Sequence, residues 1–306
     1  MKNKFICVNF IFLALILLTS CQDKYDKLDM AIYEYRDTKD LVKFVYDNAQ
    51  LLQKNGQAQI DYFKSNRSHY KTENYYLYVY KMDCTNVFHA GIPELEGKNL
   101  YNITDINGKK ILQLILEELK NKNNPHNWVH FTWYEPGTFF PVPKSSCHFE
   151  VTTDDGEKYF VGAGLNYPQE EKEFIRIIVD SAADLLQEKG LTAIDSIASP
   201  LSQFNFRDVR TFVFEPNGKI LISPIAGNNI FNFDLINSKD EIGHQPFLAA
   251  IKVLKNQDTV WQEFMAKNRY ERFPRKKCLY LRKVKLDVNS VIVGAITNLP
   301  LPPWSE

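Results

Sequence analysis

An aromatic segment with one histidine, followed by a lysine and a second histidine, is the part of this sequence best suited to binding a small molecule. Such a pocket needs apolar walls and a few polar groups that converge on the ligand. Lys144 could pair with a ligand carboxylate. The predicted ligand-binding residues are Trp128, His130, Trp133, Tyr134, Lys144 and His148. The alternative for each is structural, with the tryptophans in the core and the histidines satisfied where they lie.

The segment 128–134 is expected to be a β-strand. Alternation in a strand places two sets of side chains on opposite faces. One set is Trp128, His130, Thr132 and Tyr134, and the other is Val129, Phe131 and Trp133. We expect one aromatic-rich face to pack into the core, and the face with the imidazole and the phenol to line a cleft.

Metal binding and catalysis have weaker support. His126 and His130 are four residues apart, which is ~13 Å along a strand and too far for one metal ion. Asp105-Ile106-Asn107-Gly108 resembles part of a calcium loop, but the remaining ligand spacing is missing, so we expect a turn that caps the next helix. No catalytic serine, zinc-protease, phosphate-loop or dinucleotide motif occurs. The sequence therefore predicts a protein that is not an enzyme and has no metal or other cofactor.

The N-terminus has the pattern of an export signal. Lys2 and Lys4 precede an apolar stretch that is too short to span a bilayer. The stretch ends in Leu18-Thr19-Ser20-Cys21, which resembles the lipobox of bacterial lipoproteins. This resemblance implies a signal peptide over 1–20, lipidation of Cys21 and a tether over 21–40. The alternatives are an ordinary signal peptide or an uncleaved anchor.

Composition restricts the class of protein. Without residues 1–20 the chain has 35 basic and 37 acidic residues, because that segment removes two of the 37 basic residues and no acid. This balance gives no electrostatic basis for nucleic-acid binding. We expect the basic run 269–285 to be a solvated face, and the alternatives are a surface that contacts lipid headgroups or an acidic partner.

Three cysteines remain after export, and we expect free thiols, although an exported protein could form a disulfide. They are Cys84, Cys147 and Cys278.

The chain contains an internal repeat. At an offset of 134 residues, the segment from Ala49 to Asp61 matches the segment from Ala183 to Asp195, and at an offset of 130 Gly97 to Lys109 matches Gly227 to Lys239. Trp128 and Phe131 correspond to Trp261 and Phe264, and Cys147 falls near Cys278. The repeat predicts homologous domains over 41–168 and 169–300, with a tail over 301–306.

Each copy has the same predicted order of elements. Helical periodicity over 41–63 and 174–186 is followed by a hairpin, a short amphipathic helix and three more strands. Gly56 and Gly190 interrupt the helical patterns and mark a helix break or a close contact. The fold class is therefore α+β, in which each copy has a long N-terminal helix and an antiparallel sheet with an inserted helix.

Four segments resemble motifs of the Cache domains, which are PAS-like extracytoplasmic sensors. They are Gly97-Lys98-Asn99 with Asp105-Ile106-Asn107-Gly108-Lys109, then Asn127-Trp128-Val129-His130-Phe131-Thr132-Trp133-Tyr134-Glu135-Pro136, Lys144 to Phe149, and Tyr159-Phe160-Val161-Gly162-Ala163-Gly164-Leu165. The resemblance implies a pocket between the sheet and its covering loops for amino acids, carboxylates or amines. The second copy departs further, with Glu263, Ala266 and Leu279 at the positions of His130, Trp133 and His148, so ligand binding is expected in the first copy.

We therefore expect a membrane-anchored extracytoplasmic lipoprotein that binds or senses a small molecule. Its expected partners are a small ligand, such as an amino acid or a carboxylate, the membrane through the lipid, and a signalling protein, but no nucleic acid. The expected location is the cell envelope, facing the periplasm or the exterior, on the outer membrane if the cell is Gram-negative. The alternative is a structural or protein-interaction envelope lipoprotein with no ligand.

Overall fold

The structure is a computed structural model that describes residues 28–135, 137–207, 209–224, 234–267, 272–287 and 289–299. The predicted signal peptide, the predicted lipidation site Cys21 and the tail 301–306 lie outside the described residues. The predicted tether is shorter than expected, because helix α2 already begins at Arg36. Tyr33 within it is a core residue, 2% exposed.

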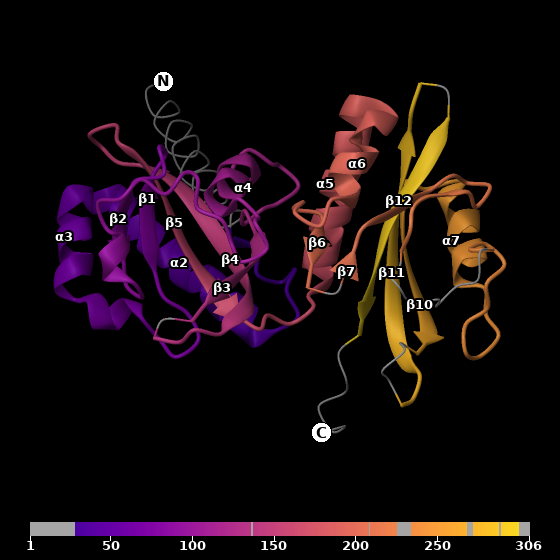
Figure 1. The fold of residues 1–306 in the computed structure, drawn as a ribbon, viewed down its shortest axis with the longest axis horizontal. Coiled ribbons are helices and arrows are strands. Elements are labelled where there is room, and N and C mark those ends of the chain that lie inside the picture. The colour runs from indigo at the N-terminus through magenta and orange to yellow at the C-terminus, as the bar shows by residue number, and fades with distance from the viewer. Residues whose placement is uncertain are drawn as a thin grey trace, which may run out of the picture.

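The first half is one antiparallel sheet covered on both faces. Its strands are β1 (Tyr78–Lys81), β2 (Asn86–His89), β3 (Val129–Tyr134), β4 (Pro141–Thr152) and β5 (Lys158–Asn166), in the order β2-β1-β5-β4-β3. Helix α2 (Arg36–Asn55) packs on β4 and β5, and α4 (Ile111–Glu118) covers the opposite face (Figure 1). Shorter helices complete this half, namely α3 (Gln57–Ser65), η2 (Arg67–Tyr70) and η3 (Pro93–Leu95).

The second half repeats this plan. Its strands are β8 (Phe212–Phe214), β9 (Ile220–Ile222), β10 (Thr259–Ala266), β11 (Arg275–Lys285) and β12 (Ser290–Asn298), in the order β10-β11-β12-β8-β9. Helix α5 (Lys172–Lys189) packs on β11 and β12, and α7 (Pro246–Leu254) contacts β10. The remaining elements are η4 (Gly190–Ala193), α6 (Ile194–Ala198) and a ribbon of β6 (Asn205–Phe206) and β7 (Val209–Arg210). The predicted α+β class with two sheets is confirmed.

The glycines that interrupt both helical patterns mark a helix break. Gly56 follows α2 with φ 54°, and Gly190 follows α5 with φ 61°. A side chain is unfavourable at positive φ, so glycine allows the chain to turn at both places. The N–H of each glycine still bonds the carbonyl of the leucine four residues before it.

Strand pairing corrects the sequence alignment of the two copies. His148 lies opposite Gly162, and Leu281 lies opposite Gly294. Leu281 rather than Leu279 is therefore the counterpart of His148, and the match of Cys147 with Cys278 is wrong by two residues. The same register makes Lys277 the counterpart of Lys144. Lys277 pairs with Phe264, and Lys144 pairs with the equivalent Phe131.

The two halves are closely joined. Helix α5 lies between the two sheets (Figure 1), and its Phe174 ring packs 4.6 Å from the Trp128 ring of the first half. Glu171, which precedes α5, accepts hydrogen bonds from the backbone N–H groups of Glu34 and Tyr35 at 2.7 and 3.0 Å. One buried cluster of apolar side chains runs through the first half, α5 and part of the second sheet. The boundaries 41–168 and 169–300 therefore stay a prediction about folding units.

Two other expectations can be compared with the structure. Cys84, Cys147 and Cys278 are buried free thiols, as expected. The basic run is only partly solvated, because Lys277 is buried and Arg282 bonds Asp184 at 2.7 Å. Over the described part of the chain, no helix is both long and apolar enough to span a bilayer.

Candidate functional site

The six predicted ligand-binding residues do not converge on one cavity. Trp128 packs against Phe174, and His130 lies 4.5 Å, ring to ring, from Phe206 of β6. On the opposite face, Trp133 and Lys144 line a common cavity, and His148 supports it from the side. Tyr134 is 42% exposed at the end of β3 and does not line that cavity.

The expected role of one strand face therefore needs correction. Phe131 and Trp133 line the cavity under α4, where core packing was expected. Trp128 and His130, on the other face, pack against α5 and β6 of the second half. His130 and Thr132 of this face also line a larger pocket, as expected for the face with the imidazole. Side chains alternate along β3 as expected, but both faces of the sheet border a cavity, so alternation alone could not identify the cavity under α4.

The cavity is small and mostly aromatic. It has a volume of about 50 Å³ and lies between the first sheet and α4. The sheet contributes Tyr76, Tyr78, Tyr80, His89, Phe131, Trp133 and Lys144, and the covering segments contribute Leu95, Ile103, Ile111, Leu112 and Ile115. No aspartate or glutamate of the described residues lines it. Such a cavity combines apolar walls with a few polar groups and suits a small ligand.

Lys144 provides the cavity's positive charge. Its side chain is 3% exposed, and its Nζ donates to the Tyr76 hydroxyl at 3.0 Å and lies 4.1 Å from the centre of that ring. No carboxylate of the described residues forms an ion pair with it. Burial lowers the pKa of Lys144 to about 7, with Glu135 opposing the shift. A bound anion would compensate this charge and favour the protonated form.

His148 and Tyr78 form a fixed hydrogen-bonded pair beside Lys144. The Nδ1 of His148 lies 2.7 Å from the carbonyl oxygen of Asn127, so that nitrogen carries the proton and donates it. The Nε2 therefore accepts from the Tyr78 hydroxyl at 2.9 Å. Burial lowers the pKa of His148 to about 4 and raises that of Tyr78, so both groups are neutral near pH 7. Gly162 leaves room for the pair, because a Cβ there would lie 2.5 Å from each ring.

Tyr76 and His89 are cavity residues that the sequence alone did not single out. The His89 ring lies 5.0 Å from the Tyr76 ring, and its Nδ1 accepts from the Ile92 N–H at 2.8 Å. Burial lowers the pKa of His89 to about 3, so the ring is neutral and its proton is on Nε2. Lys144, Tyr76 and His89 can therefore all donate hydrogen bonds. The signal that could have found them was the run of aromatic residues in the first predicted hairpin, 75–89.

The second half does not reproduce this cavity. At the positions of Tyr78, Tyr80 and His148, its sheet has Phe212, Phe214 and Leu281, and all three belong to an apolar core with Phe247 of α7. Ala266 replaces Trp133. The counterpart Lys277 is 2% exposed and donates to the Asn298 side chain at 2.9 Å. Apolar packing therefore occupies the corresponding face among the described residues.

The two metal candidates have other roles. His126 Nδ1 lies 2.6 Å from the buried Tyr33 hydroxyl. One Asp105 oxygen accepts from the N–H groups of Asn107 and Lys109, and the other accepts from Thr132 N–H at 3.0 Å. This confirms a turn, but Asp105 does not cap α4, which has no side-chain cap. Among the residues described, no three His, Cys, Asp or Glu side chains are grouped to hold a metal.

Comparison with known proteins identifies the family. The family model of the Cache domain matches residues 26–286. Similar solved structures include a methyl-accepting chemotaxis protein from Vibrio parahaemolyticus (19% identity, 49% of this chain and 95% of that chain, TM-score 0.34). Another is a Cache chemosensory domain that recognises carboxylic acids (19% identity, 49% and 97%, TM-score 0.33). A third is the ligand-binding domain of the Pseudomonas aeruginosa amino acid chemoreceptor PctB with L-Arg (9% identity, 84% and 79%, TM-score 0.27). No curated protein matches the chain. The family match covers most of the sequence, so the chain belongs to the Cache domain family.

Proposed function

We propose that this protein is an extracytoplasmic sensor, held at the membrane by lipid on Cys21, whose first half binds a small carboxylate. Membership of the Cache family supports a small-molecule ligand, since Cache domains bind molecules such as carboxylic acids and amino acids. The lipid anchor and the location in the cell envelope rest on the residues before Cys21. A separate signalling protein would pass the signal on. The protein would bind the carboxylate and would not convert it chemically.

The uncompensated charge of Lys144 is the observation that carries this proposal. A buried ammonium without an ionic partner is unfavourable, and a carboxylate in the cavity would supply that partner. Tyr76 and His89 would then donate to the same anion. Trp133 and Phe131 would contact its apolar part.

The lining also distinguishes between ligand classes. An amino acid would bury its ammonium group in a cavity whose lining contains no aspartate or glutamate. Burying a charged group without a partner is costly. We therefore expect a carboxylate without an amino group, and the volume of about 50 Å³ suits a short-chain acid. The apolar packing at the corresponding face of the second half supports binding in the first half alone.

A thermal-shift screen tests this function. Short-chain carboxylates and the corresponding amino acids would be added to the wild type and to Lys144→Met. At 100 times its Kd, a ligand of the native state adds about 2.7 kcal/mol of stability. We expect carboxylates to stabilise the wild type and to lose that effect in Lys144→Met.

Tyr134→Phe is the matched control, because the Tyr134 side chain does not line the cavity. Tyr134 is one of the ligand-binding residues predicted from the sequence, whereas its position in the structure predicts that this substitution has no effect on binding. Stabilisation by amino acids but not by simple acids would contradict the proposed ligand class. Stabilisation by neither would favour the alternative of a structural lipoprotein without a ligand.

A further inference from the structure

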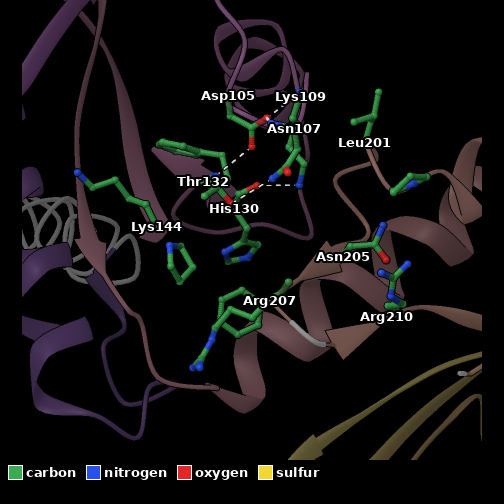
Figure 2. A pocket seen from close by; sticks show the side chains of 14 residues that line it. Asp105, Asn107, Lys109, His130, Thr132, Lys144, Leu201, Asn205, Arg207 and Arg210 are labelled. Atoms are coloured by element: carbon green, nitrogen blue, oxygen red, sulfur yellow. Dashed lines mark hydrogen bonds between the residues drawn. The ribbon is translucent and has the colours of Figure 1, made fainter. Parts of the chain in front are cut away.

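A second, larger pocket lies between the two halves of the chain. It has a volume of about 440 Å³, which is typical of small-molecule sites. The first half contributes the turn 105–109 and part of β3 and β4, and the second half contributes residues 200, 201, 205–207 and 210 of and before the β6–β7 ribbon (Figure 2). We propose that this pocket binds a small organic polyanion, with phosphate or carboxylate groups, that bridges the halves.

The charges in the pocket favour an anion. Lys109, Lys144, Arg207 and Arg210 line it, and Asp105 is the one acid among the described residues of its lining. Both Asp105 oxygens already accept backbone N–H groups. Neither arginine forms an ion pair with a carboxylate of the described residues. The pocket therefore has an excess of positive charge that the described part of the chain does not compensate.

Lys109 is held in place from the first half. Its side chain is 7% exposed, and its Nζ donates to the carbonyl oxygen of His130 at 2.9 Å. An ammonium group has three donors, so this bond leaves Nζ able to donate to a ligand. Figure 2 shows Lys109 and Asn107 on one side of the pocket, and Asn205 and Arg210 on the other.

His130 adds an unsatisfied polar atom to the wall. Its side chain is 7% exposed, and its Nδ1 lies 2.7 Å from the Ser145 hydroxyl. The buried Nε2 has no hydrogen-bond partner among the described residues. Buried polar atoms nearly always have a partner, so an atom left without one needs an explanation. A ligand or a water that it orders would supply this partner after a small movement of the ring.

This pocket differs from the cavity under α4, although Phe131 and Lys144 line both. The Lys144 side chain extends away from Arg210 in Figure 2, and its Nζ bonds Tyr76, which lines only the cavity under α4. Since both halves contribute to the pocket, a ligand there would stabilise the arrangement of the two sheets. The site therefore offers a way to couple the halves that does not depend on the proposed carboxylate cavity.

Isothermal titration with pyrophosphate and with citrate tests the proposal. We expect one of them to bind the wild type with 1:1 stoichiometry, and the one that binds identifies phosphate or carboxylate chemistry. Arg210→Gln should weaken this binding about tenfold or more, because it removes a charge-assisted hydrogen bond. Arg210 is exposed and forms no ion pair with the described residues, so this variant should fold normally, which its thermal unfolding would verify.

Two control variants make the result decisive. Arg272→Gln removes an exposed arginine elsewhere and should bind as the wild type does. Tyr76→Phe changes the cavity under α4 and not the lining of this pocket, so it should also keep full binding, which separates the two sites. The proposal is overturned if neither anion binds, if Arg210→Gln binds normally, if Arg272→Gln loses as much affinity, or if Tyr76→Phe abolishes binding.

Discussion

The affinity for a carboxylate should depend on pH through Lys144. Burial holds the pKa of this lysine at about 7 in the free protein, and a bound anion would raise it. Below pH 7 the free site is already charged, so affinity should be nearly constant. Above pH 7 the site must take up a proton when it binds the anion, so affinity should fall as pH rises until the pKa of the complex is reached.

The size of the effect follows from that pKa. With a pKa near 7, about nine-tenths of the sites are charged at pH 6 and about one-tenth at pH 8. The Kd should therefore increase about tenfold between these values, which is about 1.4 kcal/mol. Burial lowers the pKa of His89 to about 3 and that of His148 to about 4, so neither contributes in this range.

Isothermal titration at pH 6, 7 and 8, in buffers of different ionisation enthalpy, measures both the Kd and the proton uptake. We expect uptake close to one proton per ligand at pH 8 and little at pH 6. Lys144→Met should bind weakly and without the pH slope, whereas Lys158→Met, at an exposed position on β5, should behave as the wild type. A constant Kd from pH 6 to 8, or a slope that survives in Lys144→Met, would refute the reasoning.

Three further substitutions test other parts of the structure. Gly162→Ala should destabilise the fold by about 1–3 kcal/mol in denaturant unfolding, because its Cβ would lie 2.5 Å from the Tyr78 ring. An unchanged midpoint would contradict that close approach. Tyr33→Phe should cost about 1–3 kcal/mol, because it removes a buried hydroxyl that bonds His126; a cost below 0.5 kcal/mol would mean that this hydroxyl contributes little. Cys21→Ser should abolish labelling by a fatty-acid analogue and leave unprocessed precursor, and continued labelling would exclude Cys21 as the lipidated residue.

The sequence was a good guide to the order of the elements, because the signals that specify them are local. Helical and strand periodicities depend on neighbouring residues, and the internal repeat gave the same pattern twice. The exact register was less accessible. Cys147 and Cys278 are identical residues in equivalent strands, and they suggested an offset two residues away from that of the strand pairing. A shift of this size keeps side chains on the same face, so hydrophobic alternation could not reveal it.

The site was only partly predictable for a different reason. Lys144 and Trp133 were identified from their chemistry, whereas Tyr76 and His89 come from a distant hairpin and reach the cavity through the strand order β2-β1-β5-β4-β3. His130 was expected beside the ligand of the first half, and it lies instead against α5 and β6. Its environment depends on how the two halves pack together. Periodicity within one strand contains no information about that packing.

A crystal structure of the protein with a short-chain carboxylate that stabilises it would test the central proposal most directly. We expect one carboxylate oxygen at about 2.7–2.9 Å from the Lys144 Nζ, since charged hydrogen bonds are short. The ligand's other contacts should include the Tyr76 hydroxyl, with its apolar part against Trp133. A carboxylate bound elsewhere, with the cavity under α4 unchanged, would contradict the assignment of Lys144 as the ligand's ionic partner.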